Sequence, residues 1–74
     1  MSNIEAKSEI SGRVIEIVAT VGQTLQRDDP IAIVEAMKME IPVSAPRAGV
    51  LREIRVAKED NVKEGQTLAV LSID

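Results

Sequence analysis

The sequence repeats itself at an interval of 37 positions, and this repeat limits the folds that are open to the chain. A shift of 37 residues (49 − 12) superimposes identical residues and aligns many apolar positions without a gap. A chain of two similar halves predicts a structure with two-fold pseudo-symmetry, in which each half contains the same strands and turns. Identical pairs in this register include Gly12 and Gly49, Glu16 and Glu53, Ile17 and Ile54, and Ala32 and Ala69.

A second register and chance similarity are the alternatives to this repeat. Gly-Gln-Thr-Leu occurs at 22–25 and again at 65–68, a shift of 43 (65 − 22), but little else aligns in that register. We interpret these two segments as different turns that look alike. An aliphatic chain with many turns also produces some similarity by chance. We favour the repeat of 37 because it aligns core positions as well as turns.

Short apolar stretches alternate with turn residues along the whole chain. Turn residues such as Gly22 and Pro30 end these stretches before any of them is long enough to show the periodicity of an amphipathic helix. The chain is 45% hydrophobic and 0% aromatic, so its core must consist of Val, Ile, Leu, Ala and Met, and the β-branched members of this set favour sheets. We expect one all-β domain, a barrel or sandwich, over residues 8–74, preceded by a flexible tail at residues 1–7.

Charge and hydropathy exclude several classes of function. The formal net charge is −3, so the chain has no excess of basic residues to bind phosphates, and it has no aromatic residues on which bases could stack. We therefore expect no binding of nucleic acid. No apolar run approaches the roughly 18 residues of a membrane span, and residues 1–7 lack the order of a signal peptide. We therefore expect a cytoplasmic protein with no membrane partner. Without His or Cys, and with carboxylates scattered among Lys and Arg, we predict no catalytic residues and no metal site.

The hexamer Glu35–Glu40, with the sequence Glu-Ala-Met-Lys-Met-Glu, lies between the two halves and differs from the rest of the chain in its secondary-structure propensity. Its residues are strong helix formers in a chain that otherwise predicts strands. Six residues are too few to nucleate a stable helix, however, and Pro42 would end one soon afterwards. A β-hairpin with a tight tip is more consistent with the flanking segments. This hairpin would present the amine of Lys38 to solvent.

Met37 and Met39 allow two interpretations on the residues alone. Methionine is a common core filler, so the pair could be structural. At a hairpin tip only part of the pair can be buried, and exposed methionines beside a reactive amine are typical of a surface that another protein recognises. The residues by themselves leave these two interpretations about level.

The hexamer resembles the attachment motif of the biotinyl/lipoyl carrier family, and in particular of its biotinyl branch. The flanking residues also fit the spacing of that family, and the resemblance extends from Ile10 to Leu71. Lipoyl relatives have Asp before and Ala after the modified lysine, whereas Lys38 has Met on both sides. The flanking residues that match are Gly12, Val14, Gly22, Leu25, Pro30, Ile31, Ile33, Val34, Ala45, Pro46, Gly49, Gly65 and Leu68.

Some positions depart from the family pattern. Asp28 and Glu59 stand where the family has turn glycines, and Glu9 stands where many relatives have proline. Asp tolerates a left-handed backbone, whereas Glu does so less well, which leaves the turn type at Glu59 open. Val21 also continues directly into Gly22, so the protruding thumb loop of some bacterial carriers is absent from the sequence.

The resemblance implies a fold and a function. The fold is a flattened antiparallel β-barrel or sandwich with the modified lysine on a hairpin turn. Lys38 would accept covalent biotin from a biotin protein ligase, which would recognise the other five residues of the hexamer. The chain would then be a non-catalytic carrier of carboxylate between a biotin carboxylase and a carboxyltransferase. The alternatives are a lipoyl carrier of a 2-oxo acid dehydrogenase complex and an unmodified β adaptor. The expected ligase-recognition residues are Glu35, Ala36, Met37, Met39 and Glu40.

Overall fold

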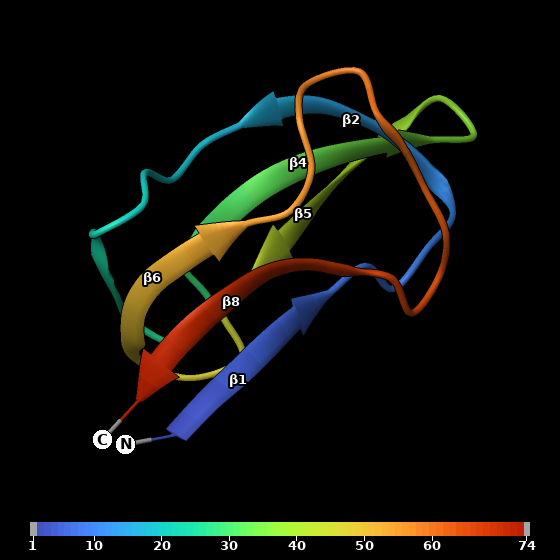
Figure 1. Ribbon diagram of the computed structural model, residues 1–74. Helices are drawn as coiled ribbons and strands as arrows, with labels where there is room; N and C mark the ends of the chain where they lie inside the picture. Colours follow the sequence, from blue (N-terminus) through green and yellow to red (C-terminus); the bar gives the residue numbers. More distant parts are fainter. Residues whose placement is uncertain (1, 74) are drawn as a thin grey trace.

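The computed structural model of the chain describes residues 2–73. All of the regular secondary structure within this range is β-strand (Figure 1). The all-β prediction is therefore confirmed. No helix in this range is long and apolar enough to cross a membrane. The strands are β1 (Ser2–Lys7), β2 (Gly12–Ile17), β3 (Thr24–Leu25), β4 (Pro30–Ala36), β5 (Met39–Ser44), β6 (Gly49–Ile54), β7 (Asn61–Val62) and β8 (Thr67–Ile73).

The strands form two antiparallel sheets that enclose an aliphatic core. One sheet has the order β1-β8-β6-β3 and the other the order β5-β4-β2-β7, with four strands in each. Inward-facing side chains of both sheets meet between them, as the alternation of buried and exposed residues along the strands requires. The core consists of Ala6, Val14, Ala19, Leu25, Ile31, Ala32, Val34, Val43, Ala45, Leu51, Val62, Leu68, Ala69 and Leu71.

The repeat of 37 residues relates one sheet to the other. It takes each strand of one sheet onto a strand of the second, with the same residue bounds shifted by 37. The last pair of the hairpin, Ala36 with Met39, corresponds to the pair of chain ends, Ile73 with Ser2. The equivalent strands are β1 and β5, β2 and β6, β3 and β7, and β4 and β8.

Residues 2–7 are a strand, so the expected flexible tail is wrong for this stretch; Met1 lies outside the described residues. Strand β1 pairs with β8 from Ser2 opposite Ile73 to Lys7 opposite Thr67. It covers an edge of β8 that would otherwise have unpaired backbone groups, and it buries Ala6 in the core. The repeat explains its presence, because β1 is the counterpart of β5.

Four turns share one hydrogen-bond pattern. In each, the first residue donates its backbone N–H to a side-chain oxygen of the fourth, and the fourth donates its N–H to the first carbonyl. The third residue has a positive φ, and it is Gly22, Asp28, Glu59 or Gly65. Glu59, with φ 78°, thus adopts the same turn as its counterpart Gly22. The four turns are Thr20–Gln23, Gln26–Asp29, Ala57–Asp60 and Lys63–Gln66.

The two Gly-Gln-Thr-Leu segments belong to turns of this one pattern at positions that the repeat does not relate. Their likeness therefore reflects a shared local geometry, whereas the register of 37 describes the fold.

Candidate functional site

The hairpin of β4 and β5 ends in a two-residue turn formed by Met37 and Lys38. The last paired residues are Ala36 and Met39, so only these two residues connect the strands. Their φ angles are 52° and 66°. Positive φ at both central residues is the signature of a type I′ turn, whose twist matches the twist of the flanking strands. The prediction that the hexamer forms a hairpin tip rather than a helix is confirmed.

This turn is unfavourable for the residues that occupy it. Type I′ turns favour Asn-Gly or Gly-Gly because a β-carbon in the left-handed region costs roughly 1–2 kcal/mol per residue. Met37 and Lys38 both have long side chains. Strain of this kind persists where the surrounding structure enforces it, and it is concentrated at functional sites.

The turn projects from the body of the molecule at the end opposite the chain termini (Figure 1). Lys38 is exposed, Met37 is 90% exposed and Met39 is 62% exposed. The two methionines are thus available to a partner and contribute little to the core. The interpretation of these residues as core fillers is inconsistent with this exposure.

The structure separates the remaining hexamer residues into two groups. Glu35 and Glu40 are exposed and lie directly opposite each other on β4 and β5. Ala36, in contrast, is 7% exposed and its side chain points inward with the buried residues of β4. Four of the five expected recognition residues therefore present their side chains to solvent, and Ala36 does not.

The start of β2 supports the hairpin next to its turn, and the sequence does not mark these residues of β2 as functional. Arg13 is paired in register with Glu35, and its Nη2 lies 3.9 Å from Glu35 Oε1. Gly12 lies so close to β4 that a β-carbon would overlap the Glu35 carbonyl oxygen. A glycine inside a strand can mark such an approach of two backbones, and this was the available signal.

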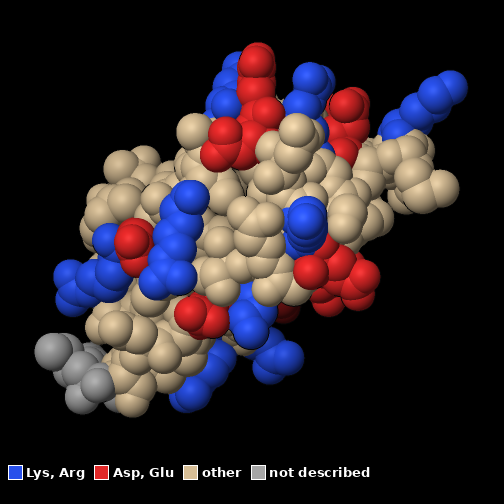
Figure 2. Space-filling model, turned by 45° about the vertical axis from the view of Figure 1, so that its right-hand side comes forward, with Lys and Arg blue, Asp and Glu red and all other residues tan. Residues whose placement is uncertain are grey.

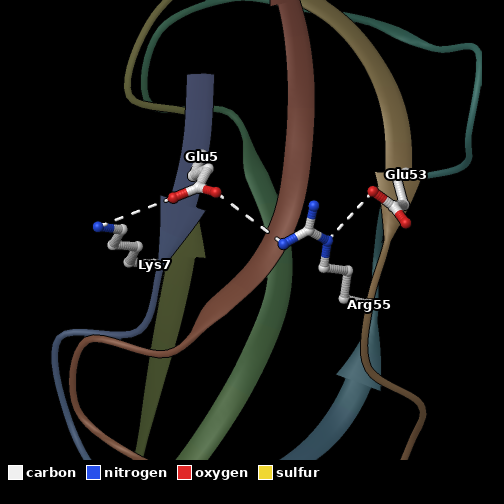
Figure 3. Close-up of polar contacts among 4 residues, drawn as sticks. All are labelled: Glu5, Lys7, Glu53 and Arg55. Atoms are coloured by element: carbon white, nitrogen blue, oxygen red, sulfur yellow. Dashed lines mark hydrogen bonds and ion pairs between the residues drawn. The ribbon is translucent and has the colours of Figure 1, made fainter. Parts of the chain in front are cut away.

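The charged residues elsewhere form an ordinary solvated surface. Figure 2 shows acidic and basic side chains intermixed over one face of the molecule, with no large area of a single sign. On the sheet of β1, β8 and β6, an exposed network joins strands on both sides of β8 (Figure 3). Arg55 lies 3.9 Å from Glu5 and 3.1 Å from Glu53, and Lys7 lies 3.8 Å from Glu5. Exposed ion pairs of this kind contribute up to about 1 kcal/mol each.

The chemistry available at the turn is that of a primary amine. Within residues 2–73 no three His, Cys, Asp or Glu side chains are grouped so that they could hold a metal ion. A groove of about 360 Å³ lies between β1 and β5, and its lining does not include the Met37-Lys38 turn. Lys38 is therefore placed where a separate catalyst can reach its amine, and it is not enclosed in a site of its own.

Comparisons with known proteins identify the family of the chain. The biotin/lipoyl family model, described as "Biotin-requiring enzyme", matches residues 2–71. A biotinylated protein TB7.3 homologue of Mycobacterium leprae is 35% identical over 68 residues, which are 92% of this chain and 96% of that protein. A biotin/lipoyl attachment protein of Bacillus subtilis is 34% identical over 64 residues, or 86% of this chain and 88% of that protein.

A solved structure shows the same fold inside a much larger enzyme. The crystal structure of the urea carboxylase of Kluyveromyces lactis matches with a TM-score of 0.92 and 33% sequence identity. The match covers 97% of this chain but only 6% of that carboxylase. Together with the family model and the two small relatives, it shows that this all-β chain belongs to the biotin/lipoyl family of biotin-requiring domains.

Proposed function

We propose that this chain is a biotin carboxyl carrier domain, which accepts biotin on Lys38 and presents it in turn to a biotin carboxylase and a carboxyltransferase. The observation that supports this most strongly is the position of Lys38 at the exposed tip of a strained type I′ turn, between two exposed methionines. A lysine with a purely structural or solubilising role would not need such a turn.

The attachment reaction needs only a free amine from this chain. The lone pair of Lys38 Nζ attacks the carboxyl carbon of biotin that a ligase has activated with ATP. A C–N bond forms, the bond to the adenylate leaving group breaks, and the amine loses its proton to give an amide. The exposed turn suits this reaction because the ligase must bring the base and the activated carboxyl to the lysine.

The bound biotin would supply a nitrogen that can hold carboxylate, a chemistry that no side chain of this chain provides. The domain would contribute a rigid mount and a flexible tether. The β4–β5 hairpin fixes where the tether begins, and the four-carbon stem of Lys38 lets its end sweep through space. Tethering raises the effective concentration of the group at each partner site without any new contact. The domain itself would catalyse neither step.

The proposed partners would contact the solvent-exposed side chains of the hexamer at the tip of the hairpin. Glu35, Met37, Met39 and Glu40 are exposed around Lys38 and form the proposed recognition surface for biotin protein ligase. Ala36 would act indirectly, because its small buried side chain keeps the end of β4 against the core. Since activation of biotin consumes ATP, we place this step in the cytoplasm.

Intact mass after co-expression with a biotin ligase and a lipoate ligase tests the proposal against its two rivals. A mass increase of one biotinyl group, with no lipoyl adduct, is the expected result. A lipoyl adduct would identify a lipoyl carrier instead. A chain without any adduct, although a control carrier is modified in the same cells, would indicate an unmodified β adaptor.

A further inference from the structure

The first residues of β2 contact the lysine hairpin near its tip, at Glu35, three residues before Lys38. A β-carbon at Gly12 would overlap the carbonyl oxygen of Glu35 and lie 2.8 Å from Val34 Cγ1. Gly12 has no positive φ, so the requirement here is for space and not for backbone conformation. Any side chain at position 12 would push β4 away at the point where the hairpin leaves the core.

The next residue contacts the same glutamate through its side chain. Arg13 Nη2 lies 3.9 Å from Glu35 Oε1, and both side chains are about half exposed. Glu35 also faces Glu40 across the hairpin, and like charges directly opposite each other in a sheet are unfavourable. Arg13 offsets this repulsion on one side, since Glu40 has no ion-pair partner among residues 2–73.

The repeat supplies an internal comparison for both contacts. Gly49, the counterpart of Gly12, is similarly close to β8, where a β-carbon would lie 2.7 Å from the Ser72 carbonyl oxygen. This contact lies in the other sheet, at the end of the molecule that holds the chain termini and opposite the lysine turn (Figure 1). The counterpart of Arg13 is Val50, so the cationic contact exists only at the lysine end.

We propose that Gly12 and Arg13 are positioning residues that fix Glu35, and through it the direction of the Met37-Lys38 turn, for the enzyme that acylates Lys38. This inference rests on the proposed function, because it concerns the same lysine. Gly12 acts on the backbone of Glu35 and Arg13 acts on its carboxylate. Neither residue touches the amine.

The test compares Gly12→Ala with Gly49→Ala in a biotinylation assay with purified biotin ligase. Both variants lose thermal stability, because both crowd a backbone. Only Gly12→Ala is expected to lower kcat/KM for the domain as substrate, by at least about tenfold, since a displacement of about 1 Å at a reacting group can cost about a hundredfold. Equal kcat/KM values for two folded variants would overturn the inference.

Arg13→Gln provides a second variant that leaves the backbone undisturbed and decides the question if Gly12→Ala does not fold. We expect KM for the domain to rise by about two- to fivefold, the range of an exposed ion pair, with little change in kcat. Arg13→Lys should restore most of the loss. The matched control is Arg52→Gln, which removes an exposed arginine of β6 that has no ion pair within residues 2–73.

An unchanged KM in Arg13→Gln, or a rise of the same size in Arg52→Gln, would contradict the role of Arg13. Failure of the underlying function gives a different result, because the wild-type chain would then take up no biotin at all. That outcome would overturn both proposals. If the wild-type chain is biotinylated and the variants are biotinylated as well as it is, only the positioning roles of Gly12 and Arg13 are overturned.

Discussion

Met37 and Lys38 both adopt the left-handed backbone conformation, with φ angles of 52° and 66°, although neither is a residue that favours it. The hairpin of β4 and β5 enforces this geometry, because the pairing of Ala36 with Met39 leaves room for only two connecting residues. Lys38, the proposed acceptor of biotin, is thus held in a turn that other residues would form more easily. Several consequences of this conflict can be measured.

Replacing the turn by Asn-Gly should stabilise the domain and abolish its function. In Met37→Asn/Lys38→Gly the residues match a type I′ turn, so we expect the free energy of unfolding to rise by about 1–2 kcal/mol. Urea denaturation measures this change. Lys58→Gly is the matched control: Lys58 has no positive φ, so glycine there should lower stability by about 0.5–1 kcal/mol. If the turn replacement and Lys58→Gly changed the free energy of unfolding equally, the backbone strain assigned to the Met37-Lys38 turn would be contradicted.

Replacing the exposed methionines should affect recognition more than folding. In Met37→Leu/Met39→Leu we expect unfolding free energy to change by no more than about 0.5 kcal/mol, since both side chains are exposed. The rate of biotinylation should fall, because the flexible thioether surface that a ligase would contact is lost. If the double variant unfolds while its biotinylation rate is unchanged, the methionines are core residues and our interpretation is wrong.

The turn at Glu59 predicts a stabilising substitution that leaves function intact. Glu59 has φ 78° and lies in the same hydrogen-bonded turn pattern as Gly22. Glu59→Gly should raise the free energy of unfolding by about 1 kcal/mol. Asp28→Gly should give a smaller gain, because Asp tolerates the left-handed region better than Glu. Thermal denaturation of the two variants decides this, and a loss of stability in Glu59→Gly would exclude the assigned turn.

Removal of residues 2–7 should destabilise the domain severely. Strand β1 pairs with β8 along its length and buries Ala6, so its loss should remove several kcal/mol from a total on the order of 5–10 kcal/mol. The control Glu5→Gln keeps the strand but removes the ion pairs that Glu5 makes in Figure 3, and should change stability by less than about 1 kcal/mol. Cooperative unfolding with unchanged stability after the deletion would restore the interpretation of this segment as a tail.

The sequence predicted the hairpin because local signals on both sides of the hexamer agreed. Helix propensity within Glu35–Glu40 pointed the other way, but the hexamer was too short to form a helix before Pro42. The repeat of 37 located the equivalent strands for the same reason, since core spacing and turns coincided. The hairpin depends on residues that are close in the sequence, and the repeat is a pattern along the sequence itself, so both can be inferred from it.

The first strand escapes sequence-based prediction because its alternation is weak. Only Ile4 and Ala6 are apolar between Ser2 and Lys7, and the partner that makes them a strand, β8, lies at the other end of the sequence. Ile4 does align with Ile41 in the register of 37, and this match was the available signal. The burial of Ala36 and the contact of Gly12 with Glu35 are also difficult to predict from the sequence. Both depend on where the hairpin projects from the core, which is set by the packing of strands distant in the sequence.

The most direct measurement is the site of biotin attachment, determined by intact mass and peptide mapping after co-expression with a biotin ligase. Wild type, Lys58→Arg and Lys63→Arg should each gain one biotinyl group at position 38. Lys38→Arg should gain none while its unfolding curve stays unchanged, since the charge remains and only the acylatable amine is lost. Biotin recovered on a folded Lys38→Arg domain would contradict the assignment of the acceptor and the role of its turn.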